Sequence, residues 1–145
     1  EQGQKRIIQF YLKYKKRINN WDLVDTSCYK ILGDYCYQFN KKELLLKLAN
    51  SSFHFERRIA MVATLAYIRK SDFELTYFLA KKFFTEKEDV MHKAAGWMLQ
   101  EARKKNQSIL ISFLNEHAQN MPRTMLRYSI EKFSPNIRKS YLLKK

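Results

Sequence analysis

The chain has 145 residues and a formal net charge of +14, because 28 lysines and arginines face only 14 acidic residues. Its 46% hydrophobic content is enough to close one core, whereas three glycines and two prolines are too few for a sheet-rich or disordered chain. No apolar stretch approaches the roughly 18 residues that cross a bilayer and no signal-peptide core opens the chain, so we expect a soluble, cytoplasmic protein without a membrane partner. We also expect a monomer.

The sequence has helical periodicity from its first residues onward. Apolar residues between positions 7 and 14 are mixed with basic residues at 13 and 15–17, and no cap precedes them, which suggests that the chain begins inside a longer repeat array and lacks its N-terminal part. Further helices are expected at 22–37, 41–50, 55–69, 72–84, 88–105, 108–119, 123–132 and 135–143. The starts near 22, 55, 88 and 123 are about 33 to 35 residues apart, the period of stacked helical hairpins. We therefore predict one all-α domain over residues 1–145, with about eight or nine helices in antiparallel pairs.

Several of these helices carry the expected local signals. Asn20 and Ser71 are candidate N-caps, and Pro135 after Ser134 fits a first helical position. Gly96 in the middle of a helix costs roughly 1 kcal/mol, so we expect a neighbouring helix or backbone to approach it closely. In the helix from residue 55, one apolar stripe is expected to face the core: Ile59, Val62, Ala63, Ala66 and Tyr67.

The cysteines and histidines do not have the spacing of a metal site. Cys28 and Cys36 lie on one predicted helix about 12 Å apart, too far for a disulfide, and we interpret both as reduced core thiols. His54, His92 and His117 occur singly, which favours core or surface roles. We predict no metal.

The basic charge is concentrated at the two ends of the chain. Residues 1–20 hold six lysines and arginines with one Glu, and residues 121–145 hold seven with one Glu. Such an uneven charge exceeds what solubility requires and favours a polyanion, most commonly the phosphate backbone of nucleic acid. A merely solvated basic face is the alternative.

Four ordered motifs resemble those of the DNA alkylation repair enzymes of the AlkD-like glycosylase family. They are residues 20–25 (NWDLVD), 56–62 (ERRIAMV), 93–101 (KAAGWMLQE) and 122–133 (PRTMLRYSIEKF). The resemblance covers the chain from about residue 5 onward and corresponds to the C-terminal part of the family's fold. It implies a right-handed, curved solenoid of HEAT-like helix pairs with a basic concave face, and it leaves the family's N-terminal helices unmatched.

The resemblance also implies a function and a set of site residues. The family are monofunctional DNA glycosylases that remove cationic N3- or N7-alkylated purines from duplex DNA without metal or organic cofactor, leaving the lesion stacked or exposed on the duplex. Asp25 matches the family's catalytic aspartate, Trp21 and Trp97 its two active-site tryptophans, and Arg58 its active-site arginine.

Physical chemistry supports these roles independently. A cationic alkylpurine is already a good leaving group, so the enzyme's task is to stabilise positive charge growing on the sugar and to orient or deprotonate a water, which Asp25 suits. Trp21 would pack against the cationic nucleotide, since an indole face attracts a cation by roughly 0.5 to 2 kcal/mol, and Trp97 would form the opposite wall. Arg58 has the planar fork suited to a phosphate beside the lesion.

Backbone contacts to duplex DNA are expected from basic residues beside the motifs and near the chain ends. The predicted set is Lys13, Lys16, Arg17, Arg57, Lys93, Arg123 and Arg127, with Lys15, Arg138 and Lys139 as further candidates.

Each of the four central residues, Trp21, Asp25, Arg58 and Trp97, also fits a purely structural role. The two tryptophans also fit an inter-helix core, and Asp25 fits a first-turn acid with Arg58 as its structural salt-bridge partner. Two other functions remain as alternatives: a helical-repeat DNA-binding module without chemistry, and a scaffold for protein partners with a chiefly apolar concave face.

Overall fold

The computed structural model describes residues 2–14, 25 and 27–144, and this part of the chain contains helices and no strands. The longer helices are α1 (Gln2–Tyr14), α4 (Lys42–Ala49), α5 (His54–Ala63), α7 (Glu74–Lys82), α8 (Asp89–Lys105), α9 (Gln107–His117), α10 (Arg123–Ser129) and α11 (Pro135–Leu142). Shorter elements are the π-helix η2 (Cys28–Gly33), α3 (Asp34–Gln38), α6 (Leu65–Arg69) and the 3-10 turns η3 (Phe83–Thr85) and η4 (Ala118–Asn120). The predicted all-α class is confirmed.

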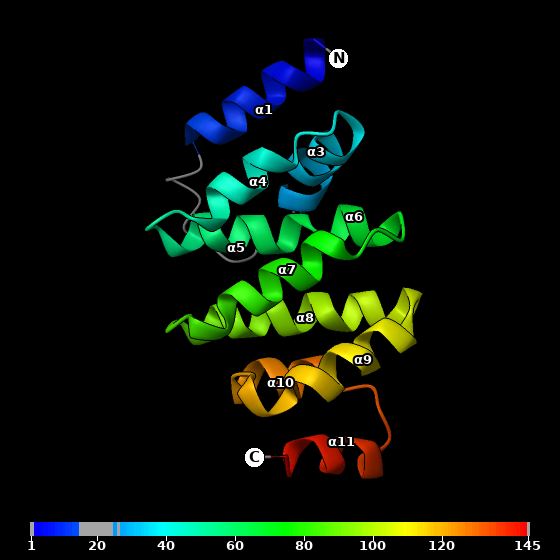
Figure 1. The fold of residues 1–145 in the computed structure, drawn as a ribbon. Coiled ribbons are helices and arrows are strands. Elements are labelled where there is room, and N and C mark those ends of the chain that lie inside the picture. The colour runs from blue at the N-terminus through cyan, green and yellow to red at the C-terminus, as the bar shows by residue number, and fades with distance from the viewer. Residues whose placement is uncertain (1, 15–24, 26, 145) are drawn as a thin grey trace.

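The helices are stacked from α1 at one end of the molecule to α11 at the other (Figure 1). In this view α7 lies in front of α8, and α9 lies in front of α10. Helix α8 packs against both α5 and α10, so these three helices form one continuous row. Such packing is that of a helical-repeat solenoid, and it places residues one repeat apart on neighbouring helices of the same row.

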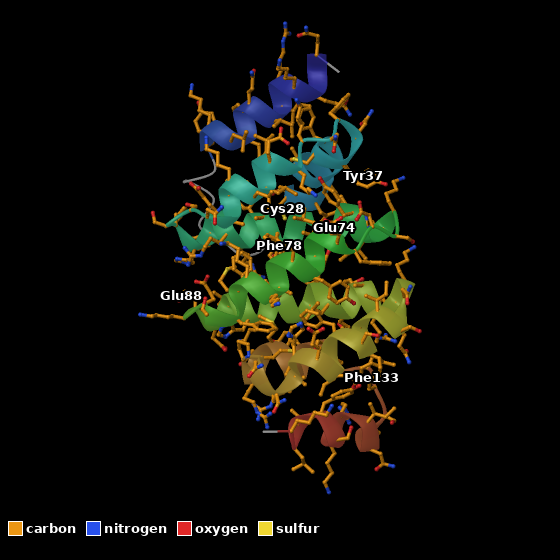
Figure 2. The ribbon with its side chains drawn as sticks, in the orientation of Figure 1. Cys28, Tyr37, Glu74, Phe78, Glu88 and Phe133 are labelled. Atoms are coloured by element: carbon orange, nitrogen blue, oxygen red, sulfur yellow. The ribbon has the colours of Figure 1, made fainter. Side chains whose placement is uncertain are left out.

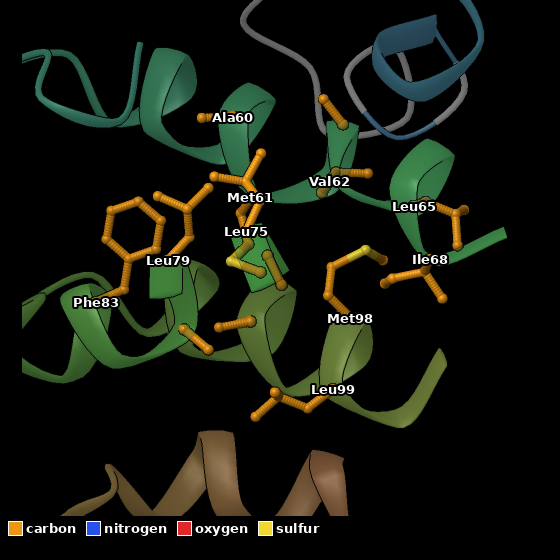
Figure 3. Close-up of a cluster of buried hydrophobic side chains, with 14 of the residues drawn as sticks. Ala60, Met61, Val62, Leu65, Ile68, Leu75, Leu79, Phe83, Met98 and Leu99 are labelled. Carbon is orange, nitrogen blue, oxygen red and sulfur yellow. The ribbon is translucent and has the colours of Figure 1, made fainter. Parts of the chain in front are cut away.

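The core fills the space between the row of α5, α8 and α10 and the helices in front of it. Figure 3 shows Met61 of α5, Leu79 of α7 and Met98 of α8 pointing into one cluster, and all three are fully buried. Burial of each such side chain stabilises the fold by about 1.5–3 kcal/mol. The apolar stripe predicted for the helix from residue 55 is buried as expected: Ile59, Val62, Ala63, Ala66 and Tyr67.

The predicted single helix over residues 55–69 is wrong, because the helix breaks at Thr64 into α5 and α6. The Thr64 hydroxyl donates to the Met61 carbonyl at 2.6 Å, and the Thr64 N–H donates to the same oxygen at 3.2 Å, which tightens this turn. Gly33 of η2 packs at the break, since a Cβ there would lie 2.4 Å from the carbonyl oxygen of Ala63. The crossing of η2 over α5 therefore requires glycine at residue 33.

The predicted helix over residues 22–37 differs from the structure in its winding. Asp25 and Ser27 are α-helical, the chain then winds as the π-helix Cys28–Gly33, and it continues as the α-helix Asp34–Gln38. A π-turn inserts an extra residue into a helix and redirects the side chains that follow. The predicted start of this helix and the candidate cap Asn20 lie outside the described residues.

Two helices end in a left-handed residue that is not glycine. Ser71 has a φ of 58°, and its N–H donates to Ile68 while Asp72 N–H donates to Tyr67, the Schellman pattern that closes α6. Asn40, with a φ of 53°, closes α3 in the same way. The prediction that Ser71 starts the next helix was therefore wrong: it ends the preceding one.

Other local predictions are confirmed. Pro135 occupies the first turn of α11 with Ser134 as N-cap. Cys28 and Cys36 are buried and free. Helix α7 lies on the other side of the molecule from the row of α5, α8 and α10. Its exposed residues Glu74 and Phe78 face the viewer in Figure 2.

Candidate active site

Asp25 and Arg58 form an ion pair with several hydrogen bonds. Arg58 Nη2 donates to Oδ1 at 3.0 Å and to Oδ2 at 2.9 Å, and Nε donates to Oδ1 at 3.2 Å. The two residues are 33 positions apart, which is the predicted repeat spacing. A planar guanidinium bonded to both carboxylate oxygens fixes the carboxylate in orientation as well as position.

Arg58 also connects this pair to the next repeat. Its Nη1 donates at 2.7 Å to the carbonyl oxygen of Val90, in the first turn of α8. The Arg58 side chain is only 9% exposed, whereas the Asp25 side chain is 27% exposed. Arg58 is thus the buried anchor, and Asp25 is the member of the pair that reaches solvent. The phosphate contact expected of Arg58 stays a prediction, because its guanidinium here is directed at protein acceptors.

Trp97 lies on α8 with its indole held in place by a neighbour. The indole Nε1–H donates to Glu101 Oε1 at 3.2 Å, and Lys104 Nζ donates to the same oxygen at 2.9 Å. The preceding residue, Gly96, lets α10 approach: a Cβ there would lie 2.5 Å from the Cβ of Tyr128. The predicted close approach at Gly96 is confirmed, and its result is that Tyr128 lies beside Trp97.

These side chains surround a hollow of about 440 Å³, a volume typical of ligand sites. It is lined by Asp25, Arg58, Val90, Lys93, Trp97 and Tyr128. The structure therefore brings together three of the four predicted catalytic residues and one predicted DNA-binding lysine. The fourth, Trp21, lies outside the described residues.

Sequence reasoning assigned no role to Val90 and Tyr128, which complete the lining. Tyr128 adds an exposed aromatic ring to the wall that Trp97 begins. Tyr128 lies within the fourth family motif, and the missing side chain of Gly96 indicated a close partner without identifying which residue that partner was.

Arg57, the neighbour of Arg58, has different partners. Its Nε donates to Glu86 Oε2 at 2.9 Å, Nη2 pairs with Glu86 Oε1, and Nη1 donates to the Ser51 carbonyl at 3.0 Å. The pair is largely buried, with 17% of the Arg57 side chain and 11% of the Glu86 side chain exposed. Arg57 therefore has a structural role between α5 and the loop before α8, and its DNA contact stays a prediction.

The remaining predicted DNA-binding residues are spread over the ends of the stack. Lys13 is exposed, with its ammonium 5.4 Å from the ring centre of Tyr14. Arg123 bonds the Leu142 carbonyl. Arg127 lines a second hollow of about 400 Å³ between α10 and α11, together with Ile130, Glu131, Pro135, Arg138, Lys139 and Leu142. Lys15, Lys16 and Arg17 lie outside the described residues.

The thiol beneath Asp25 is electrically neutral. Burial raises the pKa of Cys28 well above its ordinary value, and the negative charge of Asp25 raises it further. Cys28 is therefore a poor nucleophile at neutral pH, and the acidic and basic residues among the described ones lining the hollow are Asp25, Arg58 and Lys93.

Across residues 2–14, 25 and 27–144, no group of three or more His, Cys, Asp and Glu side chains is arranged to hold a metal ion. Within the same residues, no helix combines the length and apolar character that crossing a membrane requires.

Comparison with known proteins identifies the family. Neither the curated proteins nor the solved structures gave a match to this chain. The family model described as "DNA alkylation repair enzyme" matches residues 1–133, which include every described residue lining the 440 Å³ hollow. Because this match spans nearly the whole sequence, the chain belongs to the DNA alkylation repair enzyme family.

Proposed function

We propose that the chain is a DNA glycosylase that hydrolyses the N-glycosidic bond of cationic N3- or N7-alkylated purines in duplex DNA. Family membership supports a role in DNA alkylation repair. The observation that carries the finer assignment is the Asp25 carboxylate, fixed by Arg58 in the wall of a hollow that it shares with the Trp97 indole.

The charges of the hollow suit a leaving group that is already cationic. Ordinary glycoside hydrolysis needs two carboxyl groups, one of which protonates the leaving oxygen. Asp25 is the one carboxylate among the described residues lining the hollow. An alkylated purine carries its own positive charge and leaves without an acid, so one carboxylate is sufficient to stabilise the oxocarbenium-like sugar and to orient the attacking water.

The aromatic wall supplies the affinity for the cation. Trp97 and Tyr128 both line the hollow, and an indole face attracts a cation by roughly 0.5–2 kcal/mol. Trp21 would add a second indole on the chain segment that carries Asp25. A neutral purine gains none of this attraction, so the wall selects for the damaged base.

In this proposal, Lys93 and the basic residues around the hollow position the duplex. Lys93 is half exposed and lines the hollow beside Trp97, where a phosphate flanking the lesion would lie. Arg58 acts in this proposal through Asp25: it holds the carboxylate, and it turns toward a phosphate only if the pair opens.

A DNA-binding module without chemistry is the second candidate, and one observation favours it. Asp25 accepts hydrogen bonds from Arg58 on both of its oxygens, as a purely structural ion pair would. Such a module would bind duplex DNA in a salt-sensitive manner, yet it would release no base.

Release of free base separates the two candidates. The protein, prepared from a host that lacks alkylpurine glycosylases, is incubated with dimethyl-sulfate-treated duplex DNA, and free 3-methyladenine and 7-methylguanine are quantified by mass spectrometry. The proposal predicts release above spontaneous depurination, with no release of unmodified purines. Salt-dependent binding without release would establish the module instead.

A further inference from the structure

The indole of Trp97 is hydrogen-bonded to a carboxylate that does not line the hollow. Its Nε1–H donates to Glu101 Oε1 at 3.2 Å, one helical turn further along α8. The Glu101 side chain is 22% exposed, so water screens this contact only in part. Trp97 itself is half-buried and lines the hollow beside Asp25, Lys93 and Tyr128.

A carboxylate at this position has two effects on the ring. The hydrogen bond stops the indole from rotating about its bond to the main chain, so its face keeps one direction. The negative charge at the N–H edge also increases the electron density of the ring, which strengthens the attraction of its face for a cation. A neutral acceptor at the same position would give the first effect and only a small part of the second.

Lys104 completes the arrangement. Its Nζ donates at 2.9 Å to the same Glu101 oxygen, and its side chain is 51% exposed. An isolated carboxylate beside a DNA-binding hollow would repel phosphates, and the lysine offsets this repulsion at longer range. At short range Glu101 still bonds the indole, because one carboxylate oxygen accepts from both donors.

We propose that Glu101 is a positioning and specificity residue, which holds the Trp97 indole and polarises it to favour a cationic base over a neutral base of the same shape. This inference rests on the proposed function, since it assigns the Trp97 face to the alkylated nucleotide. Glu101 acts through Trp97 and takes no part in bond breaking.

Two duplex probes of matched shape measure the effect without catalysis. One contains 7-methylguanine and the other 7-deaza-7-methylguanine, which is neutral. Both carry a 2′-fluoro sugar that prevents base loss by destabilising the oxocarbenium ion. The ratio of their dissociation constants reports discrimination by charge, and it is measured for the parent protein, Glu101→Gln and Glu101→Ala.

The amide of Glu101→Gln keeps the acceptor and loses the charge. We expect its preference for the cationic probe to fall about threefold, while its affinity for the neutral probe changes little. Glu101→Ala should lose at least as much preference. Glu116→Gln on α9, an exposed acid that does not line the 440 Å³ hollow, is the matched control and should keep the parent ratio.

Fluorescence reports the holding role in the absence of DNA. In a Trp21→Phe background Trp97 is the only tryptophan, because the chain has two. Acrylamide quenching should rise in Glu101→Ala and stay at the parent value in Glu101→Gln, since only the alanine variant releases the indole N–H.

The outcomes distinguish this inference from the proposed function. Base release by the parent, with a binding ratio unchanged in Glu101→Gln, would overturn the specificity role of Glu101 and leave the glycosylase assignment standing. A ratio that falls in Glu101→Gln while the parent releases no base would support Glu101 and overturn the glycosylase. Unchanged quenching in Glu101→Ala would overturn the holding role.

Discussion

Replacing Gly96 with alanine is expected to destabilise the fold by about 1–2 kcal/mol, because α10 leaves no room for a side chain there. The new Cβ would lie 2.5 Å from the Cβ of Tyr128 and 2.7 Å from the carbonyl oxygen of Met125. Neither atom moves by a side-chain rotation, so α10 itself must shift. We place this overpacking at about 2–3 kcal/mol, of which the better helix propensity of alanine offsets about 1 kcal/mol.

Thermal unfolding followed by circular dichroism measures this change. For a chain of this size, a loss of about 1–2 kcal/mol lowers Tm by roughly 3–6 °C. Gly3→Ala is the matched control: it makes the same chemical change in α1, and no atom lies within 4 Å of the new Cβ. That variant should be neutral or slightly stabilised, by at most about 1 kcal/mol. If Gly96→Ala were as stable as Gly3→Ala, the close packing of α8 on α10 would be refuted.

Three further changes test other parts of the fold. Arg57→Ala leaves the carboxylate of Glu86 largely buried without its ion-pair partner, and urea denaturation should show a loss of about 2–3 kcal/mol; a loss below about 0.5 kcal/mol would contradict the structural role. Asn106→Ala removes the side-chain N-cap of α9 and should cost about 1 kcal/mol, which Asn106→Asp should restore. Burial and the charge of Glu43 raise the pKa of the Cys36 thiol to about 12, whereas a thiol in the unfolded chain titrates near pH 8.5. The unfolded chain therefore gains stability by ionising this thiol above about pH 8.5, and the free energy of unfolding falls as the pH rises toward 12, by about 1.4 kcal/mol at pH 9.5. Urea titrations at pH 7.5 and 9.5 should show a smaller fall in the free energy of unfolding for Cys36→Ala than for the parent. Equal falls would contradict the raised pKa of Cys36.

The sequence predicted the helical repeat well because its spacing and its apolar periodicity depend on the same helix geometry. The break at Thr64 was missed because the apolar stripe continues through it without interruption, and the close packing of Gly33 on Ala63 at the break depends on how η2 crosses α5. Ser71 was misjudged because a serine before acidic residues is typical of a helix start, while its left-handed φ depends on the hydrogen bonds that close α6.

The sequence predicted which residues form the candidate site, but not all of the ion pairs that hold them in place. Asp25 and Arg58 are 33 residues apart, which is one repeat, and Trp97 lies on α8, the helix next to α5 in the row, so a solenoid brings the three positions together. Arg58 was predictable as the salt-bridge partner of Asp25, whereas nothing in the sequence assigned the adjacent Arg57 to Glu86. That assignment depends on which face of α5 meets α8, which is a property of the packed structure.

The central claim is that the Asp25 carboxylate stabilises the sugar as the alkylated base leaves. Single-turnover release of 7-methylguanine from duplex DNA, with protein in excess, measures this step for the parent and for Asp25→Asn. Asp34→Asn, the same change at an exposed position at the start of α3, serves as the control. We predict that Asp25→Asn binds the duplex with nearly the parent affinity and releases base at least about a hundredfold more slowly, while Asp34→Asn matches the parent. Release by Asp25→Asn at the parent rate would contradict the account.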